Sequence, residues 1–485
     1  MTSSRENEKR DFISQFLVIA GSTIVNVVIS FFLTPLITRL VDPEEYGMMS
    51  MFNLYANIGL MVLCLGLDQA LIRFFYEKDD NKSQSSLVRF CFLTPIASTI
   101  LVSVVYCVAI STGILNIEFS LFARVLLPIH VAISIWNRIA GMVLRVTYDS
   151  KSYAFCIVLG RVIYAILIVL FLCVFQNRNI NSLVICTVLT ALVGAIASTV
   201  LGKNFWRWRN LPAVQNKKEI LKYSFPFILS MGVTNILEAA DKFALQSFCS
   251  YTELGVYQSA LSITGVFALV QTAFNTLWSP IQTEHFVKNP DDTSFIRKGN
   301  QYITVVMFLF GIHVILFKDI IILLLGEKYR GASTILPFLV LHPIMYTISE
   351  TTCSGIDKSK KTYLNIVVAL CSGVFNVIGN LLLVPVLGPK GAAISTGLSY
   401  VIFFAVRTVL SNRYYYIDYH ISKLIVILGF TILFATISTF MRFGLWTILG
   451  YLLCVSSVLI LYWTPTKELM HLGMQFAKAK LRKER

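Results

Sequence analysis

The chain has 485 residues, of which 56% are hydrophobic and only 14% are charged, and its mean hydropathy is +0.71. Soluble domains carry about 25% charged residues, so this composition excludes an ordinary soluble protein and is typical of a membrane protein. The net charge of +15 does not indicate a nucleic-acid partner, because the basic residues gather in alternate loops between apolar runs, the positive-inside pattern of a multi-pass membrane protein.

A helix needs about 20 apolar residues to cross a bilayer. An irregular backbone exposed to lipid is excluded, because its amide groups would lack hydrogen-bond partners. The sequence therefore predicts an all-α integral membrane protein with about 14 transmembrane helices. The expected spans are 12–40, 46–72, 87–111, 119–145, 152–176, 180–202, 219–248, 252–284, 296–325, 332–353, 362–386, 391–411, 420–440 and 443–463.

An even number of spans returns the C-terminus to the side of the N-terminus. Both terminal segments are basic, which predicts that both lie in the cytoplasm. The expected domains are a cytoplasmic tail at 1–11, an N-lobe at 12–202, a cytoplasmic linker at 203–218, a C-lobe at 219–413, the last two membrane helices at 414–464 and a basic cytoplasmic tail at 465–485.

The acidic turn between the first two spans has a counterpart in the second half of the chain. Three pairs of residues share one separation along the sequence, namely Glu45 and Glu253, Gly47 and Gly255, and Asp149 and Asp357. This repeat predicts two lobes of six helices each, related by a pseudo-twofold axis along the membrane normal, with two additional helices at the C-terminus. Such lobes can rock against each other and open a central pathway to each side in turn.

Two segments carry a resemblance to a known family. The first contains Pro35 to Arg39, the acidic turn 42–47 and the helix 65–74, and the second runs from Thr234 to Tyr257. In these segments the chain resembles the Wzx-type oligosaccharide flippases, the polysaccharide transporter branch of the multidrug/oligosaccharidyl-lipid/polysaccharide (MOP) exporter superfamily. The resemblance implies a MATE-like fold and a bacterial cytoplasmic (inner) membrane protein.

The resemblance also implies a function and partners. It implies transfer of an undecaprenyl-diphosphate-linked oligosaccharide from the cytoplasmic to the outer leaflet, for the synthesis of a polysaccharide such as O-antigen or capsule. The implied partners are this lipid, other membrane lipids, and a polysaccharide polymerase with other assembly proteins.

Two alternatives come from different classes. A MATE-like antiporter of drugs or organic cations should place carboxylates at mid-membrane and is expected to have twelve helices. A membrane polymerase or ligase needs a long catalytic loop on the outer side. The sequence contains none of the motifs H-E-x-x-H, G-x-S-x-G or G-x-x-x-x-G-K. We therefore expect a transporter and not an enzyme.

Five arginines are candidates for a cationic cleft that binds the diphosphate. Arg161 lies about nine residues into its span, or roughly 14 Å along the helix axis, which is near mid-membrane. Arg138 and Arg124 lie within the preceding span, and Arg39 and Arg73 lie at helix ends. Guanidinium groups bind phosphates in a bidentate manner. The alternative is that each arginine pairs with a neighbour or extends to the membrane surface.

Three carboxylates are candidates for coupling transport to an H⁺ or Na⁺ gradient, namely Asp68, Glu238 and Asp241. A buried carboxylate can bind a proton or a cation, although a local ion pair is the simpler interpretation. His130 and His342 are interpreted as core residues or, alternatively, as proton relays. The ten cysteines show no C-x-x-C spacing and are interpreted as packing residues, so no metal or other cofactor is expected.

Overall fold

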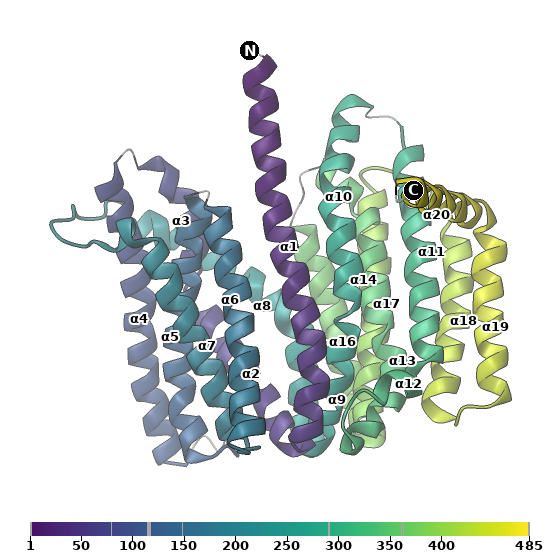
Figure 1. Cartoon of the computed structure of the whole chain (residues 1–485), viewed down its shortest axis with the longest axis horizontal. Helices are drawn as coiled ribbons and strands as arrows, with labels where there is room; N and C mark the ends of the chain where they lie inside the picture. Colours follow the sequence, from purple (N-terminus) through teal and green to yellow (C-terminus); the bar gives the residue numbers. More distant parts are fainter. Residues whose placement is uncertain are drawn as a thin grey trace. The chain divides into compact units, whose positions relative to one another are not determined.

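The structure is a computed structural model that describes residues 2–78, 80–113, 118–147, 149–289, 292–359, 361 and 363–483. Side chains are described except those of residues 1–17, 19–20, 229–230, 233–234, 236–238, 276–277, 279–280, 287, 472–473 and 476–483. Every regular element in the described residues is a helix (Figure 1). Within this part, nine helices are long and apolar enough to cross a membrane, and the number rises to 13 if each bent pair forms one span.

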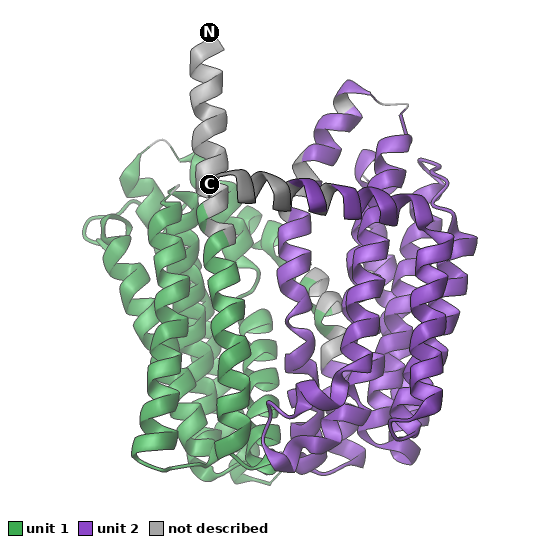
Figure 2. Cartoon of the chain, turned by 45° about the vertical axis from the view of Figure 1, so that its right-hand side comes forward, with its two compact units in different colours: residues 1–236 green, residues 237–485 purple. Residues whose placement is uncertain are grey.

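The chain divides into two compact units, Met1–Ile236 and Leu237–Arg485 (Figure 2). Unit 1 is organised around α5 (Leu121–Val146), which packs against α2, α4 and α7. Buried apolar residues recur at every fourth position of α5, from Leu127 through Val131 and Ile135 to Ile139, and give it one packing face. The other helices of this unit are α1 (Thr2–Leu40), α2 (Pro43–Leu63), α3 (Leu67–Phe74), a 3₁₀ turn (Phe75–Glu77), α4 (Asn81–Ser111), α6 (Ser150–Val169), a π turn (Leu170–Val174), α7 (Ile180–Leu201), a 3₁₀ turn (Lys203–Trp206) and most of α8 (Lys217–Phe248).

Unit 2 is organised around α17 (Pro389–Asn412), which packs against α16 and α14. The buried face of α17 is rich in small residues, including Ala392, Ser395, Gly397 and Ser399, which allow neighbouring backbones to approach closely. The remaining helices are α9 (Tyr251–Thr264), α10 (Phe267–Lys288), α11 (Ser294–Leu316), α12 (Lys318–Ile322), a 3₁₀ helix (Glu327–Thr334), α13 (Leu336–Leu339), α14 (Leu341–Thr352), α15 (Ser354–Lys358), α16 (Leu364–Leu387), α18 (Ile421–Phe440), α19 (Leu445–Leu461) and α20 (Trp463–Lys483).

The all-α fold class is confirmed, and the predicted spans agree with the helices to within a few residues at most ends. Counting each bent pair as one span gives 13 spans, and α8 occupies the remaining predicted span at 219–248. The two units divide within α8 and not in the predicted linker at 203–218. The reason is that the first turns of α8 pack on unit 1, where the Tyr223 ring meets the Phe74 ring at a centroid distance of 5.4 Å. The six-helix lobes and their twofold relation stay predictions.

The sequence repeat has a counterpart in the local structure of each unit. Glu45 is the third residue of α2, which follows Asp42, and Glu253 is the third residue of α9, which follows Ser250. Glu253 and Ser250 form a capping box, whereas the Glu45 carboxylate accepts a hydrogen bond from the backbone N–H of Ile180 at 2.6 Å. Both helices then bend, by 46° into α3 and by 41° into α10.

These bends were not expected, because the sequence predicts continuous helices at 46–72 and 252–284. Another difference is at the C-terminus, where the predicted tail at 465–485 contains most of α20, at 86° to α19.

The bend between α2 and α3 follows from two residues with positive φ, Leu65 at 55° and Gly66 at 67°. A Cβ atom at Gly66 would overlap the backbone oxygen of Ser224 in α8. Glycine is therefore required at this bend, both by its conformation and by its close contact.

We expect the substitution Gly66→Ala to destabilise the protein by more than about 2 kcal/mol, since a left-handed alanine costs about 1–2 kcal/mol before the overlap is added. Gly113→Ala is the matched control, because Gly113 also has a positive φ of 73° but has no atom within 4 Å of the added Cβ. Thermal unfolding of the purified variants in detergent measures the difference. Equal stability of the two variants would contradict the packing argument.

Candidate functional site

The structure brings together Arg138 and Asp68, a predicted cleft residue and a predicted ion-coupling residue. Both Nε and Nη2 of Arg138 donate hydrogen bonds to Asp68 Oδ2, at 3.0 and 2.8 Å, and Gln69 Nε2 donates to the same oxygen at 2.9 Å. The Asp68 side chain is 3% exposed, whereas the Arg138 side chain is 41% exposed. The buried carboxylate therefore holds a guanidinium whose remaining surface is accessible.

Arg161 in α6 has a neutral partner. Its Nε donates to Asn26 Oδ1 of α1 at 2.6 Å, and its guanidinium carbon lies 5.8 Å from the centroid of the Tyr164 ring. Among the described residues, no carboxylate forms an ion pair with Arg161. These contacts orient the guanidinium group but do not neutralise its positive charge. A site for an anion requires both conditions.

The other three cleft candidates lie at helix ends. Arg124 Nε donates to the backbone oxygen of Phe119 at 2.8 Å, in the turn that precedes its own helix. Arg73 forms an ion pair with Glu77 at 2.6 Å on an exposed surface. Arg39 is exposed in the last turn of α1. The structure thus gives Arg124 and Arg73 local partners and does not bring these three residues together with Arg138 and Asp68.

We expect Arg138→Gln to destabilise the protein by about 2 kcal/mol, because it leaves the Asp68 carboxylate buried without a charged partner. This value is below that of a fully buried ion pair, since Arg138 is partly exposed. The double variant Arg138→Gln with Asp68→Asn should recover most of the loss. Thermal unfolding of the two single variants and the double variant forms the thermodynamic cycle. If the losses of the two single variants sum to the loss of the double variant, the Arg138–Asp68 pair does not contribute to stability.

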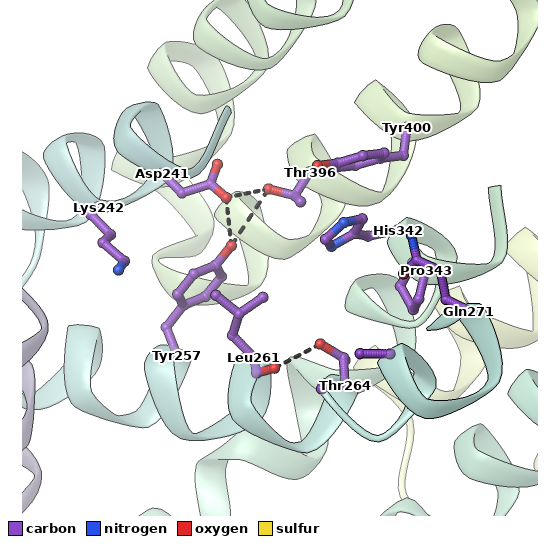
Figure 3. A pocket seen from close by; sticks show the side chains of 12 residues that line it. Asp241, Lys242, Tyr257, Leu261, Thr264, Gln271, His342, Pro343, Thr396 and Tyr400 are labelled. Atoms are coloured by element: carbon purple, nitrogen blue, oxygen red, sulfur yellow. Dashed lines mark hydrogen bonds between the residues drawn. The ribbon is translucent and has the colours of Figure 1, made fainter. Parts of the chain in front are cut away.

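Asp241 in α8 is the centre of a buried polar cluster in unit 2 (Figure 3). Its side chain accepts hydrogen bonds from Tyr257 Oη in α9 at 2.7 Å and from Thr396 Oγ1 in α17 at 2.5 Å. It also accepts from Asn376 Nδ2 at 3.0 Å and from Asn380 Nδ2 at 2.8 Å, both in α16. All four donors are neutral, and they connect Asp241 to three other helices. Burial of an ionised carboxylate in such surroundings is unfavourable unless a proton or a cation joins it.

A cavity of about 220 Å³ lies beside this cluster and is lined in part by Asp241, Tyr257 and Thr396. The His342 ring contributes to its wall and stacks on Tyr400 at a centroid distance of 3.8 Å (Figure 3). This cavity gives Asp241 access to space that a small solute or ion can enter.

The other predicted candidates in the membrane helices are Glu238 and His130. The Glu238 side chain lies outside the described residues. His130 is buried in unit 1, where its ring lies 5.7 Å from that of Phe52.

Asp241 stands out in the sequence, but the partners that make it a site do not. Asn376 and Asn380 are four residues apart within an apolar helix, so both lie on one face, and this spacing was an available signal. Thr396 offered no such signal among the many hydroxyl residues of the chain. A partly buried ion pair between Arg407 and Glu350, at 2.8 Å, was also not predicted.

The family model of the polysaccharide biosynthesis proteins matches residues 36–334. The chain belongs to this family. The match includes Asp68, Arg138, Arg161 and Asp241, and it ends before Asn376 and the other partners of Asp241 in α16 and α17. The sequence prediction of a polysaccharide transporter family is therefore confirmed at the level of the family.

One curated relative is a probable low-salt glycan biosynthesis flippase from Haloferax volcanii, 25% identical over 208 residues. The match covers 42% of this chain and 43% of the relative, so the chain spans less than half the length of that protein.

Two solved structures share the fold. The lipid II flippase MurJ in an inward-closed conformation has a TM-score of 0.67 and 16% identity, over 94% of this chain and 100% of that chain. An inward-facing MATE-family multidrug resistance transporter of the MOP superfamily has a TM-score of 0.63 and 17% identity, over 83% of this chain and 97% of that chain. The predicted MATE-like fold is thereby confirmed. The same fold occurs in a flippase and in a drug transporter, so the fold alone does not decide the function.

Proposed function

We propose that this protein is a flippase that moves an undecaprenyl-diphosphate-linked oligosaccharide from the cytoplasmic to the outer leaflet of a bacterial cytoplasmic membrane, with both of its termini in the cytoplasm. The observation that carries the proposal is the family match over residues 36–334, supported by the glycan flippase among the relatives. Polysaccharide assembly requires such a step, since a charged glycolipid headgroup does not cross hydrocarbon unaided. A polymerase and other assembly proteins would receive the product on the outer side.

Arg161 and Arg138 supply the chemistry that a diphosphate headgroup needs. In the described part of the chain, Arg161 uses Nε to bind Asn26, and its two Nη groups make no hydrogen bond. Two parallel N–H groups of a guanidinium match two oxygens of a phosphate. Arg138 is held by Asp68 and offers its accessible side. A hydrated pathway beside these arginines would carry the headgroup while the polyprenyl chain remained in lipid.

We further propose that Asp241 couples transport to an ion gradient. The cluster offers one carboxylate, two side-chain amides and two hydroxyl groups. Asn380 Oδ1 is buried and has no hydrogen-bond partner among the described residues. The oxygen and nitrogen of an amide exchange places when the side chain flips, so Asn380 can turn an oxygen toward the carboxylate. These oxygens suit a small hard cation such as Na⁺, and a proton on Asp241 is the alternative occupant.

The position of Asp241 supports a role in the transport cycle. The chain passes from unit 1 to unit 2 within α8, at residues 236–237, and Asp241 lies in the next turn of that helix. Its hydrogen bonds tie α8 to α9, α16 and α17. A cation or a proton on Asp241 would change the strength of these ties and hence the packing of the helix that connects the two units.

Translocation of a polyprenyl-diphosphate oligosaccharide in proteoliposomes tests the function. We expect the labelled lipid to become accessible at the opposite leaflet only in vesicles that contain the protein, and faster with an inward Na⁺ or H⁺ gradient. The same vesicles should not move an organic cation such as ethidium. If the protein moves the organic cation and leaves the glycolipid in place, the protein is a MATE-like antiporter and the flippase proposal is wrong.

A further inference from the structure

A second cavity in unit 2 has a different chemistry. It has a volume of about 450 Å³ and lies where the beginnings of α11 and α18 meet the junction of α19 and α20. Arg297 and Lys298 in the first turns of α11, and Lys423 in the first turn of α18, line it together with His420. Three basic side chains from two helices therefore converge on one cavity.

In the part of the chain that the structure describes, no carboxylate lies within ion-pair distance of these three basic groups. Among the described residues, Arg297, Lys298 and Lys423 form no ion pair, and Asp418 pairs with His420 at 3.1 Å. The ammonium group of Lys423 lies 6.0 Å from the centroid of the Tyr462 ring, a weak cation–π contact. Like charges that converge without a counter-charge repel one another, so the cavity favours an anion.

Tyr462 contributes an aromatic wall to the cavity. This residue lines the cavity and is 2% exposed, and its Oη is buried without a hydrogen-bond partner among the described residues. A buried hydroxyl without a partner is unfavourable and is rare in native structures. The Tyr462 ring therefore forms part of the cavity wall, whereas its hydroxyl faces the protein interior.

The surroundings indicate that the ligand is a lipid. The chain turns by 86° between α19 and α20, so if α19 spans the membrane, α20 runs along its surface. Trp463 at this turn is 63% exposed and Ile460 is 72% exposed. The nearby faces of α18 and α19 expose more apolar side chains, with Ile425 at 60% and Leu452 at 54%. A tryptophan beside apolar surface marks the headgroup region of a bilayer.

We propose that this cavity binds the phosphate headgroup of an anionic membrane phospholipid, with Arg297, Lys298 and Lys423 around the phosphate and the acyl chains along the exposed faces of α18 and α19. The basic ends of these helices belong to segments that the predicted topology assigns to the cytoplasmic side, where anionic lipids are abundant in many membranes. The site is independent of the proposed transport function, because it uses none of the residues assigned to transport.

Lipid binding to the full-length protein tests this inference. The protein is purified in a zwitterionic detergent and titrated with phosphatidylglycerol or phosphatidylcholine, and bound lipid is counted by native mass spectrometry. We expect the double variant Arg297→Gln with Lys423→Gln to bind phosphatidylglycerol about tenfold more weakly, with phosphatidylcholine binding unchanged. The control is Lys82→Gln with Arg89→Gln, which removes the same charge from exposed positions of α4 and should bind like the unaltered protein.

A single variant and a competition experiment with inorganic phosphate complete the test. Lys298→Gln alters one exposed side chain and should weaken phosphatidylglycerol binding about threefold even if the double variant does not fold. Inorganic phosphate at millimolar concentration should displace little of the bound lipid, because it lacks the acyl chains. Equal phosphatidylglycerol binding by the cavity variants and the control would overturn the proposal. Complete displacement of the lipid by inorganic phosphate would overturn the choice of a lipid as the ligand.

Discussion

Replacing Arg161 with alanine is expected to slow glycolipid translocation by about 10- to 100-fold, since a charge-assisted hydrogen bond contributes about 1.5–3 kcal/mol and each 1.4 kcal/mol is a factor of ten. Arg161→Lys should retain part of the rate, because a lysine preserves the charge but not the two parallel donors. The measurement is translocation of a polyprenyl-diphosphate oligosaccharide in proteoliposomes at equal protein density.

A variant of Asn26 separates the effect of the Arg161 charge on transport from the effect of its orientation. Asn26→Ala removes the partner of Arg161 Nε and keeps the guanidinium, so we expect a smaller loss of rate than for Arg161→Ala. Arg89→Ala is the matched control, because Arg89 is an exposed arginine in α4 and its removal should leave transport unchanged. If Arg161→Ala and Arg161→Lys both transport at the normal rate, Arg161 is structural and the cationic pathway loses its main support.

The positions of the membrane helices could be predicted from the sequence because each depends on a local property. An apolar run of about 20 residues has few alternatives in a bilayer, so the predicted span at 420–440 coincides with α18 (Ile421–Phe440). The bend at Gly66 could not be predicted in the same way, because it depends on contact with Ser224 in a helix far along the chain. The helix α20 was missed because it is amphipathic and basic, and its sequence does not differ from that of a solvated tail.

The site shows the same division between local and distant information. Three charged residues within apolar runs stand out in the sequence, namely Asp68, Arg161 and Asp241. A charged residue in a membrane span is energetically unfavourable, so it indicates a partner or a function. Their partners could not be assigned, since Arg138 is 70 residues from Asp68 and Asn26 is 135 residues from Arg161. Periodicity identifies which face of a helix a residue occupies, but not which helix that face meets.

Asp241→Asn is expected to abolish the dependence of transport on the ion gradient, while transport driven by the glycolipid's own concentration gradient continues at a reduced rate. An asparagine has nearly the shape of aspartate and can keep hydrogen bonds with Tyr257 and Thr396. It lacks the negative charge that attracts a cation or takes up a proton. Translocation is measured with a Na⁺ gradient at constant pH and, separately, with a pH gradient in the absence of Na⁺.

These two conditions identify the coupling ion, since the unaltered protein should respond to only one of them. Asn380→Leu removes an amide oxygen but no charge, so it should weaken a Na⁺ response strongly and a proton response much less. Glu327→Gln is the control, because Glu327 is an exposed carboxylate of the same unit and should keep the full response. An Asp241→Asn variant that still responds to the gradient would exclude Asp241 as the coupling residue. In that case the four hydrogen bonds at Asp241 would serve only to hold α8 against unit 2.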